Sequence, residues 1–92
     1  MSNDQLKLLQ EYAAALLAPA EIAILLDLPL EERKSFVVRC RSQQGSAEYE
    51  AFQRGRLQTK LELRQNIIKL AKAGSPAAEP LALKFIKEQN ID

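Results

Sequence analysis

The sequence predicts an all-α protein with five helices. Ala, Leu, Glu, Lys, Gln and Arg, which favour helices, dominate the chain, and no stretch alternates apolar and polar residues as a strand does. The three glycines and four prolines lie mainly at the boundaries of segments with helical periodicity. At 92 residues the chain is one small domain, and chains of this size bury only about two-thirds of their unfolded surface. Self-association is therefore one way for this protein to gain stability.

The first two helices follow from their capping residues. The first is expected to begin at Asn3 or Asp4, because short polar side chains accept a hydrogen bond from a free N–H group of the first turn. Pro19 fits the first turn of a second helix, which is short and ends near Asp27.

The third and fourth helices are longer. Pro29 predicts the start of a third helix over residues 30–42, because the residue before a proline is disfavoured in the α conformation. Ser46 is a good N-cap for a fourth helix over residues 47–73, which Gly74 ends. The apolar residues expected together on one side of the third helix are Leu30, Phe36, Val37 and Cys40.

A last helix follows Ser75-Pro76, and Pro80 moves its expected start toward Glu79 because proline is excluded from helix interiors. The expected organisation is a three-helix part over 1–45 and a long helix plus a C-terminal helix over 46–92, within one continuous domain.

The second and third helices match the pattern of a helix-turn-helix. Ala23 is a small residue where the two helices should cross, and Phe36 lies where the second helix should pack back on the first. Apolar residues occupy three further inward positions: Ile22, Leu26 and Leu28. Two packed helices of an ordinary bundle are the alternative interpretation.

Four residues depart from the helix-turn-helix pattern. Asp27 stands where glycine is usual, and Arg33 stands where an inward apolar residue is expected. Glu31 and Glu32 place carboxylates at the helix end that normally enters the major groove, where they repel phosphate.

The residue types present exclude several classes of chemistry. The chain has no His and a single cysteine, Cys40, which excludes His-based acid–base catalysis, a Cys–His nucleophile, a His/Cys zinc site and an intrachain disulfide. We expect no enzyme activity, no metal and no cofactor. No apolar run reaches the roughly 20 residues of a membrane span, so we expect no membrane partner and a cytoplasmic location.

Charge is strongly segregated along the chain. Residues 1–32 carry a net charge of −5, residues 33–72 carry +7 and residues 73–92 carry −1. A basic block suggests a nucleic-acid partner, although the acidic and basic segments could instead neutralise each other within one chain or between subunits. The candidate DNA-binding residues are Lys34, Ser35, Arg39, Arg41, Ser42, Arg54 and Arg56. Base readout is expected from the exposed side of the third helix, at Ser35, Arg39 and Ser42.

Apolar residues cover about half the circumference of the long fourth helix, more than short neighbouring helices can bury. A basic stripe of Arg56, Lys60 and Arg64 lies within this apolar arc, and Arg64 could pair with an acid such as Glu11 or Glu21. The candidate residues for an interface between copies are Leu57, Leu61, Arg64 and Ile68.

Several short motifs lie between residues 13 and 89: Glu21-Ile22-Ala23, Tyr49 with Gly55-Arg56, Leu63-Arg64, Ile67-Ile68, Leu70-Ala71, and Gly74 to Ala78. Together they resemble phage terminase small subunits and related prophage helix-turn-helix proteins. The resemblance implies a non-catalytic protein that recognises double-stranded DNA for packaging in a bacterial host, forms a homo-oligomer and works with a large packaging ATPase subunit. The alternative is a helical interaction or scaffold module whose basic residues pair with acids of a neighbouring subunit.

Overall fold

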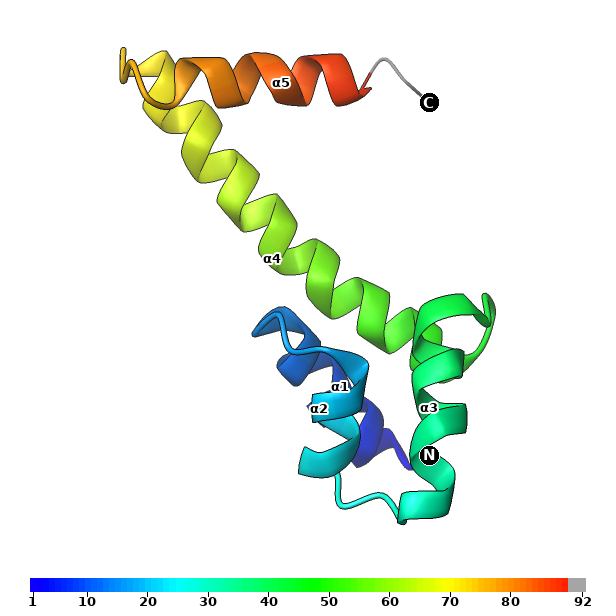
Figure 1. Ribbon diagram of the computed structural model, residues 1–92. Coiled ribbons are helices and arrows are strands. Elements are labelled where there is room, and N and C mark those ends of the chain that lie inside the picture. The colour runs from blue at the N-terminus through cyan, green and yellow to red at the C-terminus, as the bar shows by residue number, and fades with distance from the viewer. Residues whose placement is uncertain (90–92) are drawn as a thin grey trace. The chain divides into compact units, whose positions relative to one another are not determined.

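The computed structural model describes residues 1–89, which contain five α-helices and no strand (Figure 1). The all-α fold class is therefore confirmed. The helices are α1 (Asn3–Ala14), α2 (Pro19–Leu25), α3 (Leu30–Ser42), α4 (Ala47–Lys72) and α5 (Glu79–Gln89).

The chain divides into two compact units, an N-terminal unit of Met1–Thr59 and a C-terminal unit of Lys60–Asp92. The division falls inside α4 and not at residue 45, where the sequence analysis places it. The reason is that the first turns of α4 pack on α1 and so belong to the N-terminal unit.

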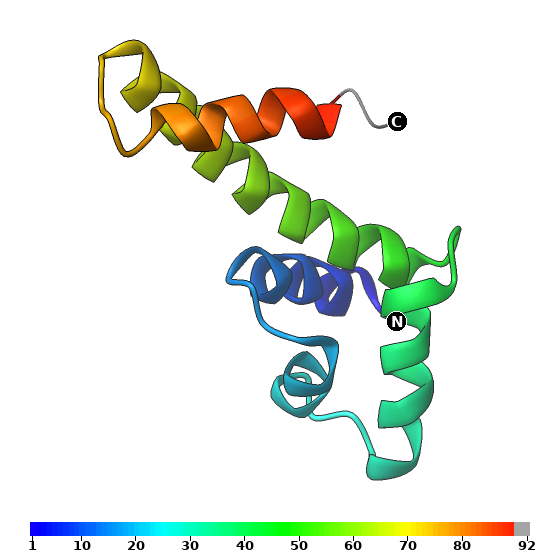
Figure 2. The ribbon, with the colours of Figure 1, turned by 45° about the horizontal axis from the view of Figure 1, so that its top comes forward.

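The N-terminal unit has one apolar core, enclosed by α1, α2, α3 and the start of α4 (Figures 1 and 2). Full burial of a Leu, Ile or Phe side chain stabilises the folded state by roughly 1.5–3 kcal/mol. The buried core residues are Leu9, Ala13, Ile22, Ala23, Leu28, Phe36, Cys40 and Phe52. The inward positions of the helix-turn-helix pattern thus lie in or against the core, whereas Leu30, expected to lie beside Phe36, is 76% exposed.

Helix starts follow side-chain caps. Ser2, and not Asn3 or Asp4, caps α1: its Oγ accepts from the N–H of Gln5 at 3.2 Å, and the Gln5 side chain accepts from the N–H of Ser2 at 3.0 Å. This reciprocal capping box satisfies two backbone donors, which a cap at Asn3 would not do. The expected cap of α4 is confirmed, because the N–H of Tyr49 donates to Ser46 Oγ at 3.1 Å.

Three helices end in the same way, with one residue in the left-handed region. These residues are Leu16 after α1 (φ 66°), Asp27 after α2 (φ 55°) and Gly74 after α4 (φ 91°). In each case the next residue donates its N–H to a carbonyl five positions earlier, as in the bond of 3.1 Å from Leu28 to Ala23. Asp27 therefore serves in the turn in place of the usual glycine, since aspartate tolerates this conformation better than most residues do.

Arg33 also has a structural role in the turn between α2 and α3. Its Nε donates to the carbonyl oxygen of Leu28 at 3.0 Å, and its side chain is partly buried. Arg33 thus occupies the position where an inward apolar residue was expected, and its hydrogen bond satisfies the carbonyl of Leu28 in the turn.

Gly55 lets α4 approach α1 closely. A Cβ atom at this position would stand 2.2 Å from the main-chain oxygen of Gln10 and 2.8 Å from Cβ of Ala13. One turn further along α4, Thr59 Oγ1 donates to the carbonyl of Ala14. The first half of α4 is thereby joined to α1 by main-chain contact.

The C-terminal unit consists of the second part of α4 and α5, joined by the turn after Gly74. Within its described residues, 60–89, the only buried side chain is Ala78. The start of α5 at Glu79 agrees with the position that Pro80 predicts. None of the described helices is long and apolar enough to cross a membrane.

Candidate nucleic-acid interface

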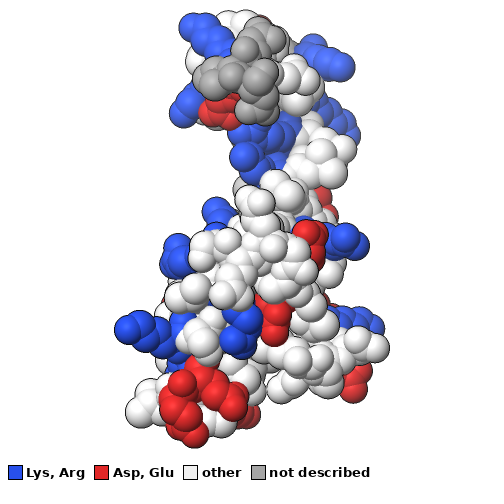
Figure 3. All heavy atoms as spheres, turned by 90° about the vertical axis from the view of Figure 1, so that its right-hand side faces the viewer, with Lys and Arg blue, Asp and Glu red and all other residues white. Residues whose placement is uncertain are grey.

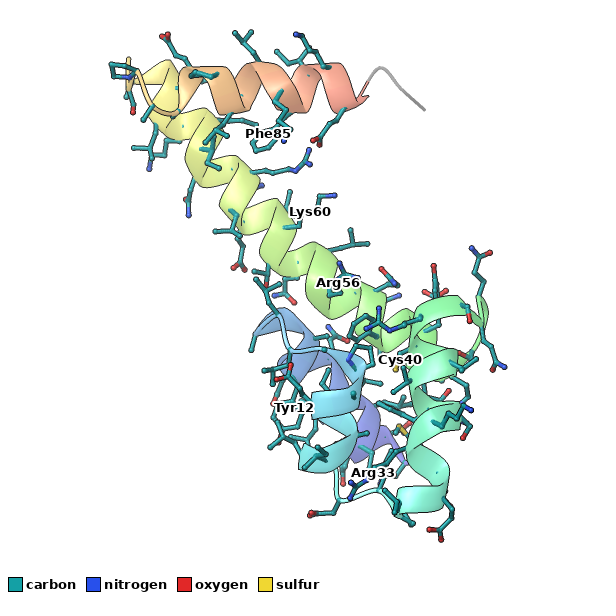
Figure 4. All side chains as sticks on the ribbon, in the orientation of Figure 1. Tyr12, Arg33, Cys40, Arg56, Lys60 and Phe85 are labelled. Carbon is teal, nitrogen blue, oxygen red and sulfur yellow. The ribbon has the colours of Figure 1, made fainter. Side chains whose placement is uncertain are left out.

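α3 separates an apolar inner side from a polar outer side. Phe36 and Cys40 are fully buried, and Figure 4 shows Cys40 on the side of α3 that faces the core. The candidate residues on the outer side are Lys34, Ser35, Arg41 and Ser42, all of which are exposed. Both serine hydroxyls donate to α3 carbonyls, Ser35 to Glu32 at 3.0 Å and Ser42 to Val38 at 2.9 Å.

Arg39 is not the freely exposed base that the sequence analysis assumes. Its Nε lies 3.4 Å from Oε1 of Glu48 at the start of α4, and its terminal nitrogen donates to Ser35 Oγ at 3.2 Å. The Nε is buried and does not meet hydrogen-bond geometry with any described residue. Arg39 therefore links α3 to α4, because its position on the helix lies at the edge that α4 covers.

Four of the candidate bases remain exposed: Lys34, Arg41, Arg54 and Arg56. The guanidinium carbon of Arg56 lies 5.5 Å from the centre of the Phe52 ring, so this side chain also lies over the edge of the core (Figure 4). Within residues 1–89 none of the four takes part in an ion pair. Their charges are therefore available to a partner.

Within residues 1–89 no acid of residues 1–32 forms an ion pair with a central base. The two ion pairs found among the described residues join Arg39 to Glu48 and Arg64 to Glu88, and neither acid belongs to residues 1–32. Glu21 instead accepts the N–H of Ala18 at 2.9 Å and so stabilises the start of α2.

Glu31 and Glu32 lie in the first turn of α3. On the face that Figure 3 shows, acidic side chains gather at the lower end of the N-terminal unit, and basic side chains lie above them together with other acids. On α3 is an open hollow of about 440 Å³, lined by Glu31, Lys34, Ser35, Val38, Arg39 and Gln43. The outer side of α3 thus offers a groove of mixed chemistry next to exposed bases.

Arg64 pairs with an acid, but with neither Glu11 nor Glu21. Its guanidinium binds the carboxylate of Glu88 on α5 and stacks on Phe85, 4.2 Å from the ring centre (Figure 4). The hydrogen bond from Arg64 holds the pKa of Glu88 below its usual value, and the nearby charges of Lys84 and Lys60 act in the same direction. Arg64 therefore joins the two helices of its own unit.

The other three residues predicted for an interface between copies are exposed. Leu57 is 55%, Leu61 56% and Ile68 38% accessible to solvent. Each could contact a partner, and no partner chain is needed to explain the position of Arg64.

Cys40, the single cysteine of the chain, is buried. Burial raises the pKa of the Cys40 thiol from 9.0 to about 11, so this cysteine is a poor nucleophile at neutral pH. No group of three or more acids and cysteines within these residues could hold a metal ion.

The described residues form a small all-α protein with exposed bases on α3 and α4. Comparison with known proteins gives no match, neither to a protein-family model nor to a curated protein nor to a solved structure. The resemblance to phage terminase small subunits therefore stays a prediction.

Two features of this region were missed by sequence reasoning. The sequence does not indicate the contact of Gly55 with α1, because a glycine within a helix signals only a lower helix propensity at that position. The pairing of Arg39 with Glu48 could be anticipated only from the packing of α3 on α4, since the two residues lie on different helices, nine positions apart in the sequence.

Proposed function

We propose that the N-terminal unit binds double-stranded DNA without catalysis, through Lys34, Arg41, Arg54 and Arg56. The observation that carries the proposal is the exposure of these four bases, which take part in no ion pair within residues 1–89. Lys and Arg bind DNA by neutralising phosphates and releasing the counterions condensed on them, and this term supplies most of the affinity for duplex of any sequence.

The helix pair α2–α3 provides a rigid support for these bases. The two helices pack on each other through Ile22, Ala23 and Phe36, which are fully buried, and Arg33 ties the turn to α3. In helix-turn-helix proteins the second helix of such a pair enters the major groove. The position of Lys34 and Arg41 on the outer side of α3 is consistent with that geometry.

The biological setting that we propose is recognition of DNA by a phage or prophage protein of the terminase small subunit type, together with a large packaging ATPase. The support for this part is the set of short motifs in the sequence, together with the order of a helix pair followed by a long helix.

A second candidate function, as a self-associating scaffold, is favoured by the C-terminal unit. A two-helix hairpin with one buried alanine has too small a core to be stable alone in water. Seven of its large apolar side chains are 38–60% exposed: Leu61, Leu63, Ile68, Leu70, Leu81, Leu83 and Ile86. Burying them against another copy would stabilise the hairpin and would multiply a weak DNA affinity by avidity.

The DNA proposal is tested by replacing the four exposed bases with alanine and titrating a labelled duplex by fluorescence anisotropy. Arg39 stays in place, because its loss would disturb the contact of α3 with α4. We expect the quadruple variant to lose affinity for all duplexes, with unchanged helical content and oligomeric state. The charge-matched control replaces four other exposed bases, Lys7, Lys72, Lys84 and Lys87.

The two candidate functions make opposite predictions for this variant. If duplex binds the wild type at low salt and only the first variant is impaired, the DNA proposal is supported. If no duplex binds and the first variant instead falls apart in size-exclusion chromatography with light scattering, the bases pair with acids of another copy. That result would favour the scaffold.

A further inference from the structure

The hollow on the outer side of α3 has a mixed lining, in which the acid Glu31 and the apolar Val38 lie beside the bases Lys34 and Arg39. Glu31, Lys34, Ser35 and Val38 are spaced by three or four residues, so they form one face of the helix and line the hollow together. Val38 is 44% exposed. The carboxylate of Glu31 repels phosphate, and the isopropyl group of Val38 offers phosphate no hydrogen bond.

The same groups suit the edges of bases. In the major groove a glutamate accepts a hydrogen bond from the amino group of cytosine, and an apolar side chain contacts the methyl group of thymine. The major groove is wide enough to admit an α-helix, so a face of α3 can reach these edges while bases beside it contact the phosphates.

Glu31 is available for such a contact. It lies in the first turn of α3, is exposed and takes part in neither of the ion pairs found among residues 1–89. The neighbouring Glu32 is also exposed but does not line the hollow, because one residue on a helix turns the side chain by about 100°.

We propose that Glu31 is a specificity-determining residue that accepts a hydrogen bond from the N4 amino group of a cytosine in the major groove. The proposal rests on the proposed DNA binding and adds to it the class of base that α3 recognises. It also explains why a DNA-binding helix would carry a carboxylate at its first turn. The amino group of cytosine satisfies the carboxylate, whereas guanine and thymine present acceptors at this edge and adenine presents its N7 acceptor beside its amino group.

Glu31→Gln and Glu32→Gln form a matched pair, because they remove the same charge from adjacent exposed positions. Both are compared with the wild type by selection from a random duplex library. We expect the wild type and Glu32→Gln to enrich the same motif, with cytosine at one fixed position. In the Glu31→Gln motif that cytosine should be lost or replaced by adenine, which glutamine binds with two hydrogen bonds.

The size of the effect is then measured on the selected duplex by anisotropy. Replacing the selected C·G pair should weaken wild-type binding by about 5- to 150-fold, the effect of one good base contact, and should weaken Glu31→Gln binding by less than about 2-fold. The same motif in both variants, or duplex binding without any motif, would overturn the role of Glu31 while leaving the DNA proposal intact. Absence of any duplex binding by the wild type would overturn both.

Discussion

Gly55→Ala tests the contact on which the N-terminal unit depends. In an exposed helix this substitution is stabilising, because alanine is favoured over glycine by about 1 kcal/mol. Here we expect the opposite sign. The new methyl group would stand 2.2 Å from the Gln10 main-chain oxygen and 3.0 Å from the Ala14 nitrogen, so α1 itself must shift.

The magnitude follows from these distances. Overpacking of a close contact costs about 1–3 kcal/mol, and the upper end applies because two of the three nearest atoms belong to the main chain and cannot rotate away. After the gain in helix propensity, the net loss is about 2 kcal/mol. For a chain of this size that corresponds to a fall in Tm of about 8–16 °C.

The assay is thermal and urea unfolding followed by circular dichroism, with Gln58→Ala as the control at an exposed position of α4. The control should change the free energy of unfolding by less than about 0.5 kcal/mol. A rise in Tm for Gly55→Ala would refute the close approach of α4 to α1.

Three further substitutions probe the N-terminal unit. Leu16→Gly should raise the free energy of unfolding by about 1 kcal/mol, because it removes the strain of a left-handed leucine (φ 66°); urea unfolding measures it. Arg33→Met should lower it by about 1 kcal/mol, since the carbonyl of Leu28 loses its donor, with Lys34→Met as the exposed control in the same assay. The stability of the wild type should fall between about pH 9 and pH 11, because the Cys40 thiol ionises near 9 when unfolded and near 11 when folded. In Cys40→Ala the free energy of unfolding should fall less than in the wild type when urea unfolding at pH 8 is compared with that at pH 11. The same fall in both proteins would contradict the role of Cys40.

The helix starts at prolines were predictable because proline acts locally. Pro19 and Pro29 mark the beginnings of α2 and α3, and Gly74 marks the end of α4, in agreement with the sequence analysis. The burial of Ala23 and Phe36 was also predictable, because their spacing is that of a helix pair packed around one contact.

Some features could not be predicted because no local signal marks them, and others because they depend on contacts between distant segments. Leu16 ends α1 in a conformation that leucine disfavours, so no local signal places the end there. The first half of α4 belongs to the N-terminal unit because Gly55, which has no side chain, lets it pack closely on α1. Arg64 pairs with Glu88 because α5 folds back along the second part of α4. Helical periodicity does not indicate which residues of other helices a side chain contacts. For this reason the sequence analysis expected Arg39 to be exposed and without an ion-pair partner.

The salt dependence of duplex binding tests the central claim most directly. The logarithm of the affinity falls linearly with the logarithm of the salt concentration, by about 0.9 per phosphate neutralised. If Lys34, Arg41, Arg54 and Arg56 each contact a phosphate, the slope for the quadruple alanine variant should be shallower than that of the wild type by up to about 3.6. The charge-matched control variant should keep the wild-type slope. Equal slopes for the wild type and the quadruple variant, or an equal loss of slope in the control, would contradict the assignment of DNA binding to this surface.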